Sequence, residues 1–270
     1  MRGICLLSLC VLFGCAEDGG GETITLADAA MNESDGPPAA PTCNETTRRA
    51  DIEGPFNCAG EPEYVEVVDR GRPFHIFKYE ASHPLANADR GFPCAVTIGE
   101  TYEAPEGDTQ ACSQAGVVPW HNVRWAEANE ACEAIGWRMC SRQELVRACE
   151  GPSGYAYTFG PTYENGKCNV REAYRTNPEM AGTVAPSGYF EDCVSSEGVH
   201  DLTGNLWEWS NERDDSDGST RFYHMAGWKT IAERHRDTDQ VCTVDSRIPG
   251  FSARSFMKEY VGFRCCRNAD

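Results

Sequence analysis

Cysteine is the residue type of this chain with the widest range of chemistry, because a thiol can be acylated, bind a metal or pair as a disulfide. The 270 residues include fifteen cysteines. Their spacing does not match a zinc site, since the sequence has no Cys-x-x-Cys pair and no histidine pair at ligand spacing beside them. Twelve of them follow residue 15, an even number that allows up to six disulfides. These are Cys43, Cys58, Cys94, Cys112, Cys132, Cys140, Cys149, Cys168, Cys193, Cys242, Cys265 and Cys266.

The first fifteen residues predict export and a lipid anchor. The stretch from Ile4 to Phe13 is almost wholly apolar but too short to span a bilayer as a helix, which is typical of a secretory signal. Residues 12–15 (Leu-Phe-Gly-Cys) resemble a bacterial lipobox, so we expect cleavage before Cys15 and acylation of that cysteine. Ala16 favours the outer membrane under the enterobacterial sorting rule. The alternative is an ordinary signal peptide that contains a cysteine. In an exported chain, the twelve later cysteines are expected to form disulfides.

Composition divides the rest of the chain. Residues 16–42 have no hydrophobic periodicity and contain a triple glycine and a proline pair, so they predict a disordered tether. Residues 43–270 are long enough for one large domain with its own core. The formal net charge of −18 argues against nucleic acid as a partner and permits cation binding, although a solvated acidic face also explains it.

Local patterns predict the elements that position these residues. Residues 64–79 alternate apolar and polar side chains around a turn at 70–73, which predicts a hairpin. Residues 81–117 are rich in Gly and Pro and contain two cysteines, so we expect a loop closed by a disulfide. From residue 152 onward the pattern is short strands and long loops, and with the two helices described next this indicates a loop-rich α+β domain.

Two helices are expected between the hairpin and the loops. Apolar spacing predicts the first from Trp125 to Ile135. The second begins with Ser141 and Glu144, a capping-box pattern in which the hydroxyl and the carboxylate each accept a hydrogen bond from a first-turn N–H. Its predicted apolar face consists of Leu145, Ala148 and Cys149.

Three motifs in order identify a resemblance. They are the paired-helix region 118–144, Gly204-Asn205-Leu206-Trp207-Glu208-Trp209, and Gly262-Phe263-Arg264-Cys265. Together they resemble the formylglycine-generating (sulfatase-modifying factor) domain family, a variant of the C-type-lectin-like fold. The resemblance covers about residues 63–267 and implies an α+β, loop-rich, disulfide-stabilised fold. Phe77-Lys78-Tyr79-Glu80 lies where the family has its opening strand, and Cys140 departs from the family, which usually has proline there.

The resemblance implies a calcium loop. In the family, Ca²⁺ is held by two side-chain oxygens and by two main-chain carbonyls, and such hard oxygen ligands suit this ion. The matching positions here are Asp201 and Glu208 for the side chains, and Gly204 and Leu206 for the carbonyls. The alternative is that Glu208 only bonds the loop backbone while the neighbouring tryptophans pack. A second, weaker site would use Asn169 and the carbonyl of Val170, with an acidic partner near residues 178–179.

The resemblance also implies two disulfides, Cys132–Cys265 and Cys149–Cys242. Cys140 and Cys266 are extra to the family, and each adjoins a member of the first pair, so we expect them to pair with each other. Three further pairs are assigned only by proximity in the sequence: Cys94–Cys112, Cys43–Cys58 and Cys168–Cys193.

The cysteines that carry the family's chemistry are missing. Active members bind Cu(I) with two cysteines shortly before the match of Cys242 and use them to oxidise a substrate cysteine to formylglycine; two soft thiolates suit Cu(I). Residues 227–241 of this chain contain no cysteine. Copper is therefore not expected as a cofactor.

These observations predict an exported, lipid-anchored envelope protein whose domain has lost the oxidase site. We expect it to bind a peptide or protein, or to act as a scaffold, through the loop-rich face around residues 210–240, where the family binds its peptide. One alternative is an oxidoreductase of the formylglycine-generating type that uses other cysteines, such as a strained vicinal pair of Cys265 and Cys266. A second is a carbohydrate-binding module, by analogy with C-type lectins.

Overall fold

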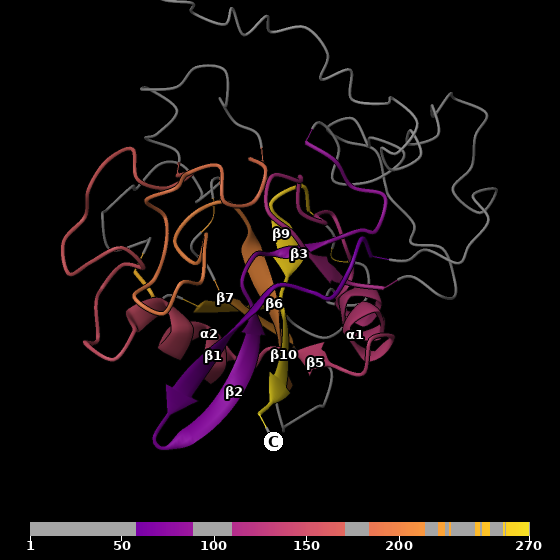
Figure 1. Ribbon diagram of the computed structural model, residues 1–270, viewed down its shortest axis with the longest axis horizontal. Coiled ribbons are helices and arrows are strands. Elements are labelled where there is room, and N and C mark those ends of the chain that lie inside the picture. The colour runs from indigo at the N-terminus through magenta and orange to yellow at the C-terminus, as the bar shows by residue number, and fades with distance from the viewer. Residues whose placement is uncertain are drawn as a thin grey trace, which may run out of the picture. The chain divides into compact units, whose positions relative to one another are not determined.

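The computed structural model of the protein describes residues 58–88, 110–170, 184–213, 221–224, 227, 241–243, 245–248, 256 and 258–269 (Figure 1). Within these ranges short strands and two helices are joined by long loops, as expected for an α+β domain. No helix in the described part is both long and apolar enough to cross a membrane.

The predicted hairpin is confirmed. Strand β1 (Tyr64–Asp69) pairs antiparallel with β2 (Arg72–Phe77), with Asp69 opposite Arg72. The turn is shorter than predicted, because Arg72 and the following proline already belong to β2. Its two residues, Arg70 (φ 47°) and Gly71 (φ 78°), both have positive φ, the geometry of a two-residue turn that matches the twist of the flanking strands.

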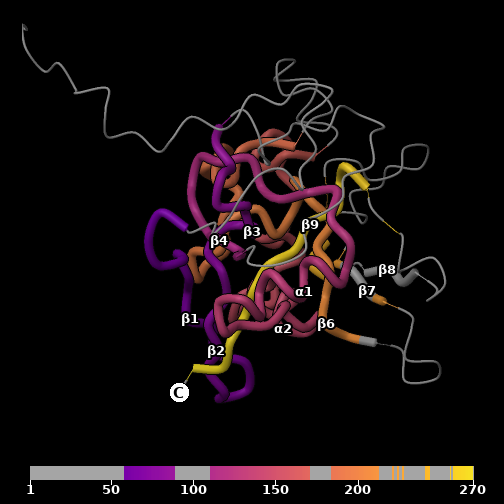
Figure 2. The backbone as a smooth tube through the Cα atoms, turned by 90° about the vertical axis from the view of Figure 1, so that its right-hand side faces the viewer, coloured from indigo at the N-terminus to yellow at the C-terminus, as the bar shows by residue number. Residues whose placement is uncertain are grey.

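Two larger sheets organise the domain. The first has the order β1-β2-β10-β5, where β5 is Arg138–Met139 and β10 is Cys265–Asn268. The second has the order β8-β7-β6-β9, with bounds β6 Trp207–Arg213, β7 Arg221–His224, β8 Asp245–Ile248 and β9 Val261–Phe263. A two-stranded ribbon joins β3 (Ala81–Ser82) to β4 (Cys112–Ser113). The last strands β9 and β10 run as one continuous segment from the second sheet into the first (Figure 2).

The parallel pairing of β6 with β9 brings two of the sequence motifs together. Trp207 lies opposite Val261 and Glu208 opposite Gly262. Gly262 has to be glycine, because a Cβ there would lie 2.8 Å from the carbonyl oxygen of Trp120. The two motifs are far apart in sequence but form adjacent strands, and this register determines which of their charged side chains meet.

Both helices form as predicted, with small differences at their ends. Helix α1 spans Trp125–Glu133, two residues shorter than the predicted helix. Helix α2 spans Arg142–Glu150, and its capping box is present: Ser141 Oγ accepts from the Glu144 N–H at 3.1 Å, and the Glu144 carboxylate accepts from the Ser141 N–H at 2.8 Å. The predicted apolar face of α2 is buried.

Strand β10 separates two hydrophobic clusters. Successive side chains of a strand point to opposite faces of a sheet. Cys265 therefore faces the cluster that contains Trp207, Trp209 and α1, whereas Cys266 faces the cluster that contains Leu145 of α2. Both cysteines are fully buried.

Candidate functional site

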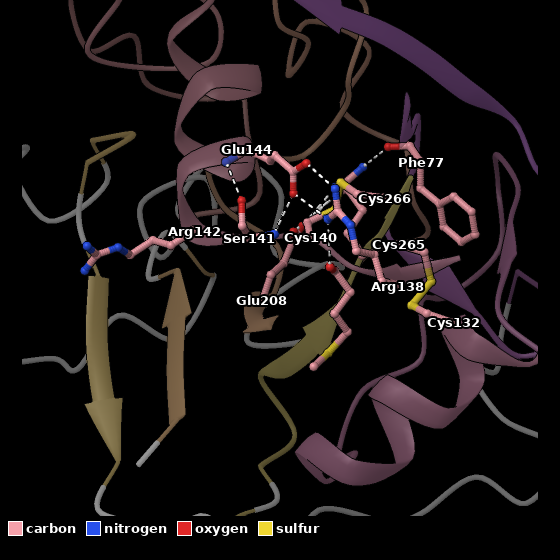
Figure 3. The surroundings of a disulfide bond; sticks show 12 residues. Phe77, Cys132, Arg138, Cys140, Ser141, Arg142, Glu144, Glu208, Cys265 and Cys266 are labelled. Atoms are coloured by element: carbon pink, nitrogen blue, oxygen red, sulfur yellow. Dashed lines mark hydrogen bonds and ion pairs between the residues drawn. A yellow bond between two sulfur atoms is a disulfide. The ribbon is translucent and has the colours of Figure 1, made fainter. Parts of the chain in front are cut away.

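Ten of the cysteines form five disulfides in the described residues. Four of these are pairs that were expected, and the Cys132–Cys265 and Cys140–Cys266 bonds lie close together on the two sides of β10 (Figure 3). The five pairs are Cys58–Cys112, Cys132–Cys265, Cys140–Cys266, Cys149–Cys242 and Cys168–Cys193.

Two pairs predicted from proximity, Cys43–Cys58 and Cys94–Cys112, are wrong, because the structure pairs Cys58 with Cys112. The main-chain bond from the Glu63 N–H to the Ser113 carbonyl, 3.1 Å, aligns the chain after Cys58 with β4. This long-range alignment brings the two cysteines together across 54 residues of sequence. Cys43 and Cys94 lie outside the described residues, as does Cys15.

The proposed vicinal disulfide between Cys265 and Cys266 is also wrong. Because neighbouring positions of a strand face opposite sides, each cysteine bonds a different partner, Cys132 on α1 and Cys140 ahead of α2. None of the ten cysteines in the described part is left as a thiol. This part of the molecule therefore offers no thiolate for metal binding or nucleophilic chemistry.

A buried ion pair joins the two motifs on β6 and β9. The Glu208 carboxylate accepts from Arg264 Nη2 at 2.9 Å and from Nε at 3.2 Å, and the side chains are 2% and 0% exposed. Arg264 also donates to the carbonyls of Phe77 (3.0 Å) and His200 (2.9 Å). The guanidinium thus links the first strand pair, the loop before residue 201 and the second sheet.

Glu80 is a second fully buried acid beside this pair. Its carboxylate accepts hydrogen bonds from the Leu206 N–H (3.0 Å), from Ser187 Oγ (3.2 Å) and from the amide of Asn205. Burial, followed by the nearby charges of Asp201 and Glu208, raises the pKa of Glu80 well above its usual range. The sequence places Glu80 in a strand motif, and its local pattern does not indicate a charged site.

Asp201 is the third buried acid of this cluster. Its Oδ2 accepts from the Gly188 N–H at 2.7 Å, and its backbone has a positive φ of 62°. Burial is the main cause that raises the pKa of Asp201 to about 7, and the charge of Glu208 adds to the effect. Three buried carboxylates, Glu80, Asp201 and Glu208, thus lie around the single guanidinium of Arg264. We refer to these four residues as the acidic cluster.

The charges of the acidic cluster bear on whether the loop 201–208 could hold the calcium ion that the resemblance implies. With all three carboxylates ionised, one arginine leaves an excess of two negative charges in a region shielded from water, which a divalent cation would neutralise. In the described part, however, no group of three or more His, Cys, Asp or Glu side chains is arranged to hold a metal. A cation held by Asp201 and Glu208 would therefore depend on main-chain oxygens, which Gly204 and Leu206 would supply.

The simpler interpretation of this loop was that Glu208 bonds the loop backbone while the tryptophans pack. Both Trp207 and Trp209 are buried. The partner of Glu208 is the guanidinium of Arg264, however, and the backbone N–H of Leu206 is bonded by Glu80 instead. The sequence pattern did not indicate this partner, Arg264, which lies between β9 and β10.

Asn169 and Val170, expected in a second calcium site, lie against the same loop. The Asn169 carbonyl accepts from the Asn205 N–H at 2.8 Å, and the Asn169 side-chain amide donates to Asn205 Oδ1 at 2.9 Å. A Cβ on Gly204 would lie 2.8 Å from the Asn169 oxygen and 3.1 Å from Val170 Cγ1. These two residues therefore support the first loop, while residues 178–179 lie outside the described ranges.

With this geometry, comparison with known proteins identifies the family. The sequence profile of the sulfatase-modifying factor enzyme 1-like domain matches residues 53–269, and the chain belongs to this family. A comparison with curated proteins found no match.

The fold is also similar to that of solved structures. One is PvdO from Pseudomonas aeruginosa, with 16% identity, a TM-score of 0.50 and coverage of 76% of this chain and 90% of that chain. Another is Treponema denticola variable protein 1, with 11% identity, a TM-score of 0.51 and coverage of 79% and 94%. At these identities the similarity concerns the fold alone. The domain is thus a disulfide-stabilised, formylglycine-generating-enzyme-like fold, as the sequence motifs predict.

Proposed function

We propose that this domain does not make formylglycine and serves in binding or scaffolding at the cell envelope. One observation carries the proposal: residues 227–241 contain no cysteine, and all ten cysteines of the described part are already paired. Cysteines held in disulfides neither ligate copper nor act as nucleophiles without prior reduction. The partner that we propose is a peptide or protein, and it would bind the face around residues 210–240. Most of these residues lie outside the described ranges.

Calcium is the ion that we propose for the loop 201–208. Asp201 and Glu208 would hold it with the carbonyls of Gly204 and Leu206, and the bound ion would supply positive charge to the acidic cluster. The protein's own part is to keep these oxygens in place. Glu80 contributes by accepting from the Leu206 N–H, and Arg264 contributes by orienting Glu208.

We expect no conversion of a sulfatase-type Cys-x-Pro-x-Arg peptide by this protein, with or without added copper and reductant. The physical reason is that no two free thiolates are available for Cu(I). Mass spectrometry of the incubated peptide detects the loss of sulfur that accompanies formylglycine formation. A family member that has both cysteines serves as the positive control, since its product establishes that the assay works.

A mass change of the peptide would overturn the non-catalytic proposal. If Cys140→Ser with Cys266→Ser then abolished that activity, the oxidoreductase alternative would replace it. A glycan array provides the corresponding test of the carbohydrate-binding alternative, and specific binding there would identify sugar as the ligand class.

The proposed place of action is the outer membrane, reached through an acylated Cys15. A single acyl chain anchors weakly, whereas the several chains of a bacterial lipoprotein cysteine hold a protein stably. We expect a fatty-acid probe to label the wild-type protein, and Cys15→Ser to abolish the label and release the protein from the membrane fraction. Cys10→Ser is the matched control and should leave both results unchanged. An unlabelled wild-type protein would contradict the anchor.

A further inference from the structure

The loop that carries the candidate calcium ligands contains three residues with positive φ. Asp201 (φ 62°) and Asn205 (φ 52°) occupy the left-handed region although neither is glycine, and Gly204 (φ 98°) lies between them. Aspartate and asparagine tolerate this region better than other residues with side chains, but surrounding contacts are still needed to keep them in one conformation. The geometry of the loop must therefore be imposed by its neighbours.

Two short segments bond the main-chain N–H groups of Asn205 and Asp201, in addition to the side-chain bonds that these residues make with Ala185, Glu80 and Gly188. On one side, the Asn169 carbonyl accepts from the Asn205 N–H at 2.8 Å, and the Asn169 side chain donates to Asn205 Oδ1 at 2.9 Å. On the other side, the Cys193 carbonyl accepts from the Asp201 N–H at 2.9 Å. Cys193 Sγ also lies 3.0 Å from the Thr203 carbonyl oxygen. Both left-handed residues are thus held at their main-chain N–H groups.

A disulfide joins these two segments directly. Cys168, next to Asn169, is bonded to Cys193, and both side chains are 1% exposed. Neither segment belongs to a helix or to one of the named strands, so no regular ladder of hydrogen bonds fixes their separation. Around the bond there is only a small apolar cluster, completed by Val170 and three partly buried aromatic residues. The covalent bond therefore links directly the two segments whose carbonyls bond the N–H groups of Asn205 and Asp201.

We propose that the Cys168–Cys193 disulfide positions the loop 201–206 for cation binding and thereby sets its calcium affinity. The inference rests on the proposed calcium site and goes beyond it, because neither cysteine is a ligand. Cys168 and Cys193 are positioning residues that act through Asn205 and Asp201. Opening the bond frees the loop to leave its left-handed conformation, and the ligands are then no longer arranged in advance.

The test is calcium titration calorimetry on the full mature chain in detergent micelles, with Ca²⁺ itself as the probe. We expect the paired substitution Cys168→Ser with Cys193→Ser to weaken binding by at least tenfold, because losing groups that orient metal ligands typically costs ten- to a hundredfold in affinity. The matched control is Cys58→Ser with Cys112→Ser, which removes a disulfide on the β3–β4 ribbon and should keep the wild-type Kd. Circular dichroism at the titration temperature establishes that each variant is folded.

The possible outcomes distinguish a failure of this inference from a failure of the proposed calcium site. Wild-type protein that releases no heat with Ca²⁺ overturns the calcium site and the inference together. Wild-type binding with an equal Kd in the Cys168/Cys193 variant overturns the inference alone. Equal weakening in the control variant also overturns it, because the effect would then be one of general stability.

A second measurement covers the case in which the Cys168/Cys193 variant does not fold. Coupling between two events is reciprocal, so a bond that raises calcium affinity must itself be protected by calcium. Wild-type protein is exposed to graded dithiothreitol, and the new thiols are alkylated and located by mass spectrometry. Calcium should delay the appearance of Cys168 and Cys193 thiols and leave Cys58 and Cys112 unaffected. Equal reduction of Cys168–Cys193 with calcium and with chelator would overturn the proposal.

Discussion

Arg264→Met is expected to lower the free energy of unfolding by about 3 to 5 kcal/mol at pH 7, the usual cost of removing one partner from a buried ion pair. The guanidinium is the only cation of the acidic cluster, and it is fully buried. Its removal leaves Glu208 without its charged partner and takes one donor from each of the carbonyls of Phe77 and His200. Chemical denaturation followed by circular dichroism measures the loss.

The matched control for this variant is Arg267→Met, three residues later. Arg267 is half-buried, lies over the rings of Tyr64 and Trp137, and donates to His75. Contacts of this kind at the surface contribute about 0.5 to 1 kcal/mol, so the control should be only slightly less stable than the wild type. Adding Glu208→Gln to Arg264→Met should recover part of the loss, since it removes the unpaired charge. Equal stability of the two arginine variants would contradict the assigned role of Arg264.

Prediction from sequence succeeds where the residues that determine a feature can be recognised from local patterns. The hairpin, the capping box of Ser141 and Glu144 and the buried face of α2 depend on residues close together in the chain, and local patterns encode them. The pair Cys140–Cys266 could be predicted because each member adjoins an expected disulfide. In such cases the neighbouring residues allow few alternative elements or cysteine pairs.

Other features depend on contacts between distant segments and could not be predicted in this way. Cys58 meets Cys112 because the chain at Glu63 bonds to Ser113, a main-chain contact with no signature in side-chain pattern. Glu208 meets Arg264 because β6 and β9 pair in parallel with one particular register. The buried state of Glu80 likewise follows from the tertiary structure, since its neighbours Asn205 and Ser187 come from far along the chain.

The acidic cluster should make the stability of the calcium-free protein fall as pH rises. Asp201 has an ordinary pKa of 3.8 and a folded-state pKa of about 7, so between these values the folded state binds more protons than the unfolded state. Stability from this group is therefore complete below about pH 4 and is lost as pH rises towards 7. The raised pKa of Glu80 acts in the same direction.

The change Asp201→Asn isolates this effect from all other titrating groups. Asparagine tolerates the positive φ at this position and can still accept from the Gly188 N–H, but it does not titrate. Between pH 5 and pH 7.5 in chelator, we expect the wild type to lose about 2 to 3 kcal/mol relative to the variant. Denaturant unfolding of both proteins at the two pH values measures this difference.

Saturating calcium should reduce the pH dependence of the wild type, because an ion at the proposed site would bind the ionised carboxylates and compete with protons for them. Calcium would accordingly bind more tightly at pH 7.5 than at pH 5, and its stabilising effect on the wild type would grow over the same interval. Parallel pH profiles of wild type and Asp201→Asn in chelator would show that Asp201 does not titrate in this range. If the wild-type profiles with and without calcium were parallel, calcium would not bind at the acidic cluster, and any bound ion would lie elsewhere.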